Sequence, residues 1–186
     1  MSTEGIFRRS GSVKRVQDLQ RQFDSPRYGK DLDWTAYSVY DAADLLKRYF
    51  NQLPEPLIPL GFYDRFRGPI CALQDYELMH VHPIWKKNSD VEKVVIVYRK
   101  LLQELPKLNR YLLLYVLRLL AIFTSRIDEN RMTPESLCAI FQPGLLAHPR
   151  HNMAPREYKL NHNVLLFLFD HQDQLLSGSD DFTKCM

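Results

Sequence analysis

The stretch YLLLYVLRLLAIFTSRI, residues 111–127, is the strongest candidate for a membrane span in this 186-residue chain. Its 17 residues are fewer than the roughly 20 that a spanning helix needs. Arg118 lies at its centre, where a cationic side chain costs about 2.5–3.5 kcal/mol on insertion scales. We therefore predict that residues 110–127 form a helix buried in the core of a globular domain.

Apolar residues recur with the helical period of 3.6 residues along the rest of the chain, and no sustained alternation typical of strands is present. The pattern predicts seven helices, over residues 13–23, 38–53, 62–73, 90–102, 110–127, 133–142 and 157–176. Short connections join these segments, and no internal repeat is visible. We expect an all-α fold, a single-domain helical bundle over residues 1–176, with residues 177–186 as a flexible C-terminal tail.

Capping residues mark several of the predicted helix ends. Ser38 followed three residues later by Asp41 resembles a capping box, in which each side chain binds the other residue's backbone amide. Thr133 followed by Pro134 places an N-cap before a proline at the first helical position, where a missing amide hydrogen is harmless. We expect Gln142-Pro143-Gly144 to end that helix. The other predicted N-caps are Ser10 or Ser12 for the first helix and Ser89 or Asp90 for the fourth.

The charge of the chain is nearly balanced, with 25 basic and 22 acidic side chains. Proteins that wrap nucleic acid duplexes or coat membranes normally carry a larger and clustered basic excess. The composition, 45% hydrophobic, also excludes an intrinsically disordered chain. Residues 1–30 hold seven basic and three acidic side chains, so the positive charge is concentrated near the N-terminus.

The three cysteines, Cys71, Cys138 and Cys185, form no CxxC pair and leave an odd number. This usage is typical of proteins in a reducing compartment, and the sequence opens on a polar stretch with arginines instead of a signal peptide. We therefore expect a cytoplasmic protein, with recruitment to the cell cortex as an option.

Several kinds of active site are missing from the sequence. It contains no phosphate-binding GxxxxGK[ST] or GxGxxG loop and no GxSxG nucleophile motif. The pairs His80-x-His82 and His148-x-x-His151 lack a cysteine or carboxylate at metal-ligand spacing, so we interpret them as surface histidines in loops. We expect no metal site, no bound cofactor and no complete active site in this chain.

The segment TEGIFRRSGS, residues 3–12, carries the most information about function. Two adjacent arginines, Arg8 and Arg9, follow the apolar pair Ile6-Phe7, which could anchor the turn. Adjacent residues near a helix start point about 100° apart, so only one arginine can aim at a given target. Taken alone, the segment could equally be a solvated basic turn.

Together with three other motifs, this segment resembles the Rho-type GTPase-activating (RhoGAP) domain. The matching residues are Gly5 to Gly11, Leu46-Lys47 with Leu53 to Leu57, Asn130 to Thr133 with Leu137, and Phe141-x-Pro143 before Leu145-Leu146. Their order and spacing agree from Thr3 to about Leu176. The forms Phe141-Gln142-Pro143-Gly144 and Ile58-Pro59-Leu60 are most similar to the fungal branch of the family.

The resemblance implies a GTPase activator that inserts an arginine into the active site of a Rho-family small GTPase in its GTP-bound form. GTP and Mg²⁺ would belong to that partner, and the activator would need no cofactor. Such an arginine is worth about 10³–10⁵ in rate. The motif puts this role on Arg8 and places Lys47 on the face that contacts the GTPase. Arg9, also expected at the partner-binding site, would support the loop or lie on the surface.

The chain also departs from the family pattern at residues expected to bind the partner. Asn51 replaces a common arginine, while Ser136 and Gly144 stand where asparagine is common, and Gln142 replaces a glycine. We expect these residues at the partner-binding site, and Gln142 could supply a substitute amide. The family normally has a further helical segment before Thr3. If this sequence is a whole natural chain, we expect some core surface to be bare near its start; the alternative is that the sequence is a fragment or an incomplete gene model.

Two other functions remain open at this point. A non-catalytic binding module would use Lys47 and the helical face to dock a GTPase without accelerating hydrolysis. A helical bundle could instead use its basic N-terminus to bind phosphoinositides or phosphopeptides.

Overall fold

The computed structural model describes residues 1–74, 88–151 and 153–176 of the chain. Within these residues all regular structure is helical and no strand occurs, which confirms the all-α prediction. The helices are α1 (Val13–Asp24), α2 (Val39–Asn51), α3 (Tyr63–Gln74), α4 (Asn88–Glu104), α5 (Lys107–Thr124), α6 (Ile127–Asn130), α7 (Pro134–Leu145), α8 (Pro155–Asp170) and α9 (Gln172–Leu176), with 3-10 turns η1 (Trp34–Ala36), η2 (Leu60–Phe62) and η3 (Pro149–His151).

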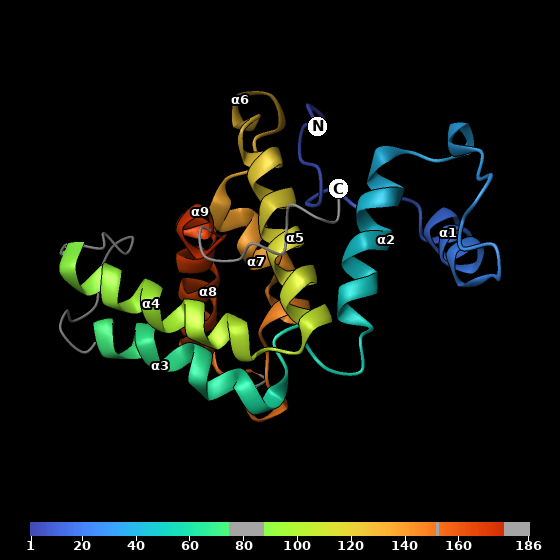
Figure 1. Cartoon of the computed structure of the whole chain (residues 1–186). Coiled ribbons are helices and arrows are strands. Elements are labelled where there is room, and N and C mark those ends of the chain that lie inside the picture. The colour runs from blue at the N-terminus through green and yellow to red at the C-terminus, as the bar shows by residue number, and fades with distance from the viewer. Residues whose placement is uncertain (75–87, 152, 177–186) are drawn as a thin grey trace.

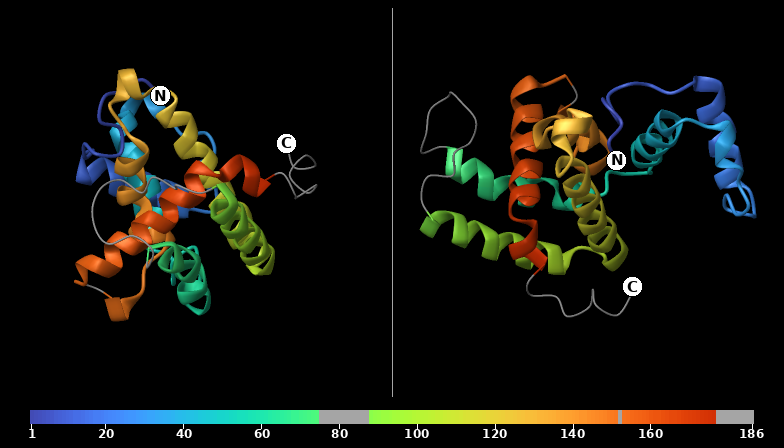
Figure 2. Two further views of the ribbon diagram at one scale, coloured as in Figure 1. Left: turned by 90° about the vertical axis from the view of Figure 1, so that its left-hand side faces the viewer. Right: turned by 90° about the horizontal axis from the view of Figure 1, so that it is seen from above.

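Helices α5, α7 and α8 form the centre of the molecule (Figure 1). The antiparallel pair α3 and α4 packs against one end of this centre, mainly through α8. On the other side α2 packs on α7, and α1 packs on α2. Figure 2 shows α1 as the outermost helix, projecting away from the centre. The helix α7 therefore joins the α1–α2 pair to the rest of the fold.

The apolar stretch that opened the sequence is the core helix α5. Its side chains Leu113, Leu117 and Leu120 are fully buried, and none of the described helices is long and apolar enough to cross a membrane. The helix begins at Lys107, three residues before the predicted start, because Pro106 serves as its N-cap. Asn109, which we expected in the connection, lies inside the helix and donates from Nδ2 to the carbonyl of Leu57 at 2.9 Å.

The helix α7 runs through Pro143 and ends at Leu145, one residue beyond the Gln142-Pro143-Gly144 stretch that we expect to end it. A proline inside a helix has no amide hydrogen for the carbonyl four residues earlier. Pro143 therefore leaves the carbonyl of Ala139 without its helical donor, and the hydroxyl of Tyr158 on α8 donates to that oxygen at 3.2 Å. A contact from the neighbouring helix replaces the lost bond and lets α7 run on.

The other predicted helix ends and caps either agree with the structure or differ from it by a few residues. The Ser38–Asp41 capping box and the Thr133 N-cap are confirmed, and Ser12 is the N-cap of α1 but accepts no side-chain hydrogen bond there. Helix α4 begins at Asn88, so the predicted caps at Ser89 and Asp90 are wrong. The last predicted helix divides into α8 and α9 at His171, and the single turn α6 was missed, so the described residues contain more than seven helices.

The interpretation of His148 and His151 as surface histidines is also wrong. Both are half-buried, and Nδ1 of His151 lies 2.8 Å from the hydroxyl oxygen of Tyr63 on α3. No group of three or more potential metal ligands occurs in the described part of the chain. The pair His80 and His82, Cys185 and the predicted tail lie outside the described residues.

The burial of α5 gives a direct test of the fold. Replacing Leu117 with Ala should lower the free energy of unfolding by about 2–5 kcal/mol, because the change removes buried methyl groups and leaves a cavity. The matched control is Leu108→Ala on the same helix, where the side chain is 80% exposed and the change should stay within about 0.5 kcal/mol. Urea unfolding followed by circular dichroism measures both, and equal effects would contradict the placement of α5.

Candidate functional site

Residues 4–12, which we call the arginine loop, form a tight turn. The amides of Arg8 and Arg9 both donate to the carbonyl of Gly5, at 2.9 and 2.8 Å, and the amide of Gly5 donates to the carbonyl of Asn130 at 2.8 Å. Phe7 adopts a left-handed backbone conformation with φ of 68°, which is uncommon for a residue other than glycine. The backbone on both sides of the two arginines is therefore fixed.

The ring of Phe7 anchors the loop in the core, as the sequence predicted for Ile6-Phe7. Phe7 is only 3% exposed, and its ring packs edge-on against Phe123 of α5 and Phe141 of α7, with centroids 4.9 and 5.1 Å apart. Aromatic pairs of this kind contribute about 0.5–1.5 kcal/mol each beyond their buried area. These contacts hold an otherwise unfavourable backbone conformation in place.

Arg8 follows this anchor and is exposed. Its Nη2 donates to the carbonyl of Arg131 at 2.7 Å and lies 3.6 Å from the sulfur of Met132. No carboxylate in the described residues forms an ion pair with it. A guanidinium offers five N–H donors, so most of those of Arg8 remain available at the surface.

Arg9 is directed elsewhere, as expected for adjacent residues in this turn. Its Nη2 pairs with Glu4 at 3.2 Å, and both side chains are exposed. The carbonyl of Glu4 in turn accepts from the hydroxyl of Tyr40 on α2. Arg9 thus lies on the outer side of the loop, within the same short turn as Glu4.

Lys47 holds the arginine loop from the α2 side. Its Nζ donates to the carbonyl of Phe7 at 2.7 Å and pairs with Asp44 at 2.6 Å. The second oxygen of Asp44 accepts from the amide of Gly11 at 2.7 Å. Lys47 is therefore half-buried beneath the loop. Its predicted contact with a partner stays a prediction.

Asp41, one turn earlier on α2, is a fully buried carboxylate that the sequence identified only as a capping residue. Besides the amide and hydroxyl of Ser38, it accepts from the amide of Ser12 at 2.7 Å and from Nε of Arg15 at 2.6 Å. Burial alone would raise the pKa of Asp41, but these hydrogen bonds outweigh it and hold the pKa well below its ordinary value. A Cβ on Gly11 would lie 2.4 Å from this carboxylate, so only glycine fits there.

Asn130 is a second organising residue whose role the sequence did not reveal, although it belongs to one of the quoted motifs. Its buried side chain donates to the carbonyls of Met1 and Phe123, at 3.1 and 2.7 Å, and accepts from the amide of Met132 at 2.8 Å. With the bond from Gly5 to its carbonyl, Asn130 joins the arginine loop to the end of α5 and the start of α7.

The remaining predicted site residues lie partly at the surface and partly in the interior. Asn51 is exposed at the end of α2, and Ser136 is half-buried, where its hydroxyl accepts from Thr133 at 3.1 Å. Gln142 and Gly144 are buried, and Oε1 of Gln142 has no hydrogen-bond partner among the described residues. Any part that these two residues take in partner binding is therefore indirect, through the packing of α7.

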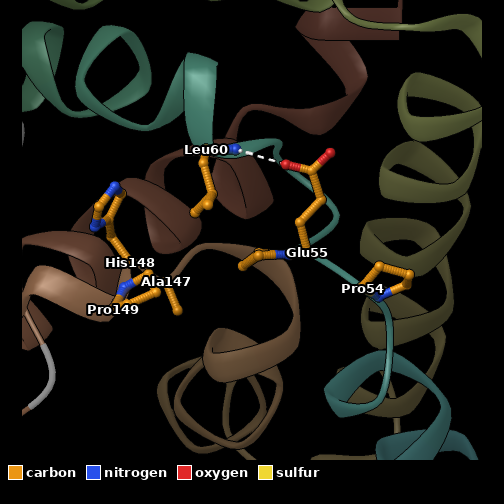
Figure 3. Close-up of a pocket in the computed structure, with 7 residues that line it drawn as sticks. Pro54, Glu55, Leu60, Ala147, His148 and Pro149 are labelled. Carbon is orange, nitrogen blue, oxygen red and sulfur yellow. Dashed lines mark hydrogen bonds between the residues drawn. The ribbon is translucent and has the colours of Figure 1, made fainter.

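A small hollow of about 170 Å³ lies beyond the end of α2 and is separate from this site. Figure 3 shows its mostly apolar lining, with the amide of Leu60 donating to Glu55. The lining residues are Pro54, Glu55, Pro56, Leu60, Ala147, His148 and Pro149. None of them belongs to the arginine loop or to the predicted site residues.

The sequence model of the RhoGAP domain matches residues 1–150, which include the arginine loop, Lys47 and Asn130. The chain belongs to the RhoGAP domain family. Rho-GTPase-activating protein 5 of Schizosaccharomyces pombe is 42% identical over 174 residues, which cover 93% of this chain and 44% of that protein. Rho-GTPase-activating protein BAG7 of Saccharomyces cerevisiae is 39% identical and is matched over 99% of this chain and 43% of its own length. The chain thus spans less than half of these two relatives.

The likeness to the fungal branch is confirmed by these two relatives, since Rho GTPase-activating protein 1 of Mus musculus is only 28% identical. Two solved structures show the fold. The human Rho GTPase activating protein 15 has a TM-score of 0.72 at 20% identity and is matched over 94% of this chain and 75% of its own. The BH domain from GRAF has a TM-score of 0.73 at 21% identity, over 95% and 85% of the two chains.

The buried carboxylate of Asp41 predicts a pH-dependent stability. A group whose pKa is lower in the folded than in the unfolded chain stabilises the fold above its unfolded pKa, about 3.9 for aspartate, and loses that effect as the pH falls toward the folded value. The free energy of unfolding should therefore decrease below about pH 4, and Asp41→Asn should remove part of that decrease.

At neutral pH Asp41→Asn should cost about 1.5–3 kcal/mol, because it replaces an accepting oxygen by a donor facing Ser12 and Arg15. Denaturant unfolding from pH 3 to 7 measures both effects. Asp24→Asn, at an exposed carboxylate of α1, is the control and should leave the pH dependence unchanged. An unaltered profile in Asp41→Asn would contradict the role assigned to this carboxylate.

Gly144 gives a test of close packing between α7 and α2. A Cβ at this position would lie 2.6 Å from Cβ and 2.9 Å from the carbonyl carbon of Phe50. Gly144→Ala should therefore destabilise the fold by about 1–3 kcal/mol through overpacking. Gly61→Ala, where a Cβ meets nothing within 4 Å, should change stability by less than about 0.5 kcal/mol. Thermal or denaturant unfolding measures both changes in stability, and equal losses in the two variants would contradict this packing.

Proposed function

We propose that this domain accelerates GTP hydrolysis by a Rho-family small GTPase in its GTP-bound form, with Arg8 entering the partner's nucleotide site. The observation that carries the proposal is an exposed arginine whose own backbone is fixed by hydrogen bonds and whose close acceptors, among the described residues, are a neutral carbonyl and a thioether. Membership of the RhoGAP family supports the same partner class.

The chemistry requires little from this chain beyond one well-placed cation. GTP and Mg²⁺ are held by the partner, so the activator needs no cofactor of its own. Negative charge that spreads over the phosphoryl oxygens in the transition state is stabilised by the guanidinium, whose planar donors match phosphate oxygens. An arginine supplied in this way accelerates hydrolysis about 10³–10⁵-fold, which corresponds to about 4–7 kcal/mol of barrier at 1.36 kcal/mol per tenfold.

The resting position of Arg8 opposes this role only weakly. To reach a partner, the side chain must release the carbonyl of Arg131, and a hydrogen bond that involves a charged group contributes about 1.5–3 kcal/mol net. That cost is smaller than the expected gain in the transition state. The backbone contacts of Lys47 and Asn130 keep the loop ordered meanwhile, so binding does not have to fix it.

Arg8 is favoured over Arg9 by their different surroundings. Arg9 pairs with Glu4 within the loop, whereas Arg8 makes no ion pair in the described residues. Arg9 therefore acts on the loop or its surface, and Arg8 acts on the partner. The non-catalytic binding module would keep the same fold and docking face, and differs only in giving no acceleration.

Single-turnover GTP hydrolysis with a panel of purified Rho-family GTPases tests the proposal. The wild-type domain should accelerate phosphate release by at least one panel member, and Arg8→Ala should reduce that acceleration by about 10³-fold or more. Arg8→Lys should restore little, because an ammonium lacks the planar fork. Binding to the GTP-loaded partner should fall much less than the rate.

Arg9→Ala is the matched control for Arg8→Ala, since it removes a neighbouring guanidinium of the same loop. It should retain most of the acceleration. Normal activity of Arg8→Ala, or equal losses in the two variants, would contradict the assignment of Arg8. Tight binding of a GTP-loaded partner without any acceleration by the wild-type domain would instead identify a non-catalytic module.

A further inference from the structure

Ser10 is an exposed residue of the arginine loop to which the proposed function gives no role. It lies two residues after Arg8, between the hydrogen-bonded turn of the arginine loop and the start of α1. Neither its amide nor its hydroxyl has a hydrogen-bond partner among the described residues, whereas the amides of Gly11 and Ser12 that follow are bound by carboxylates of α2. Both the hydroxyl and the adjoining backbone of Ser10 are thus accessible.

Ser12, the other serine of the loop, is a poorer candidate for modification. It is half-buried, and its amide lies 2.7 Å from Oδ1 of Asp41. A phosphate on Ser12 would bring a second negative group beside this buried carboxylate, and like charges at short range repel strongly in the interior. The structure therefore favours modification of Ser10 over modification of Ser12, although the two serines are only two residues apart.

The residues before Ser10 give it the charge pattern of a kinase substrate. Arg8 and Arg9 occupy the two preceding positions, and both side chains are exposed. Within the part of the chain that the structure describes, Arg9 pairs with exposed Glu4 alone, at 3.2 Å, and such surface pairs are weak. Kinases select substrates partly through patterns of charge around the acceptor hydroxyl. An acidic kinase groove can therefore bind the guanidinium of Arg8, which precedes Ser10 by two positions.

We propose that Ser10 is a phosphorylation site for an arginine-directed serine kinase, and that the phosphate disables Arg8; this rests on the proposed function. In the transfer, Oγ of Ser10 attacks the γ-phosphorus of ATP. A new O–P bond forms, the bond from phosphorus to the β,γ-bridging oxygen breaks and ADP leaves. The hydroxyl proton passes to the catalytic carboxylate of the kinase.

The phosphate would compete for Arg8 against a weak acceptor. Phosphoserine carries a charge of about −1.5 to −2 and three accepting oxygens, while the present acceptor is the neutral carbonyl of Arg131. To its hydrogen bonds a phosphate adds the attraction between opposite charges, which a neutral carbonyl does not offer. If the phosphate pairs with Arg9 instead, its negative charge still lies beside Arg8. That charge repels the nucleoside triphosphate that the partner holds.

The test uses the whole chain with the catalytic subunit of cAMP-dependent protein kinase and Mg²⁺-ATP. Intact mass should show one added phosphate, and peptide fragmentation should place it on Ser10. Ser12→Ala should still be modified, and Ser10→Ala should not. In single-turnover hydrolysis with the responsive GTPase, the phosphorylated chain should accelerate at least tenfold less than the unmodified chain. Phosphatase treatment should restore the rate, and kinase-treated Ser10→Ala should remain fully active.

Each outcome bears on a different statement. No phosphate on Ser10 in the folded chain, or a phosphate there with unchanged acceleration, overturns the inference and leaves the proposed function intact. An unmodified chain that accelerates no GTPase contradicts the proposed function, and the inference falls with it. Loss of acceleration in the Ser10→Ala chain without kinase would show that the hydroxyl itself matters, and would also overturn the inference.

Discussion

Three charged side chains on one face of α2 hold the arginine loop in place. Asp41, Asp44 and Lys47 are spaced three residues apart, so they lie along the same side of the helix. Between them they bind the amides of Gly11 and Ser12 and the carbonyl of Phe7. A short loop has few contacts of its own, and the geometry of its arginine therefore depends on these charged groups.

The same loop is coupled to the hydrophobic core through aromatic rings. Phe7 packs on Phe141, which also packs on Phe50 with ring centroids 6.1 Å apart. Because α7 carries Phe141 and approaches α2 closely at Gly144, a shift of α7 would move the support of Phe7. Substitutions in this part of the core are expected to change the position of Arg8 as well as the stability of the domain. Loss of function there does not by itself identify a residue that touches the partner.

Features that depend on residues close together in the chain could be predicted from the sequence. The burial of α5, the capping box at Ser38 and the apolar anchor at Phe7 follow from local spacing and composition, and the structure agrees. Features that depend on distant groups could not be predicted. The substitute donor to the carbonyl of Ala139, inside α7, is one such group, because the hydroxyl of Tyr158 lies on another helix. Lys47 was expected at the surface, and its acceptor is a carbonyl 40 residues earlier in the chain.

The left-handed conformation of Phe7 restricts the side chains that this position can accept. An isoleucine or valine would supply apolar area, but a branched Cβ is strongly disfavoured at a φ of 68°. A glycine would accept the backbone angle and leave the slot between Phe123 and Phe141 empty. An unbranched side chain that ends in a flat ring satisfies both demands. Natural variants of this position should therefore favour aromatic residues and avoid those branched at Cβ, whatever happens at the more permissive surface positions around it.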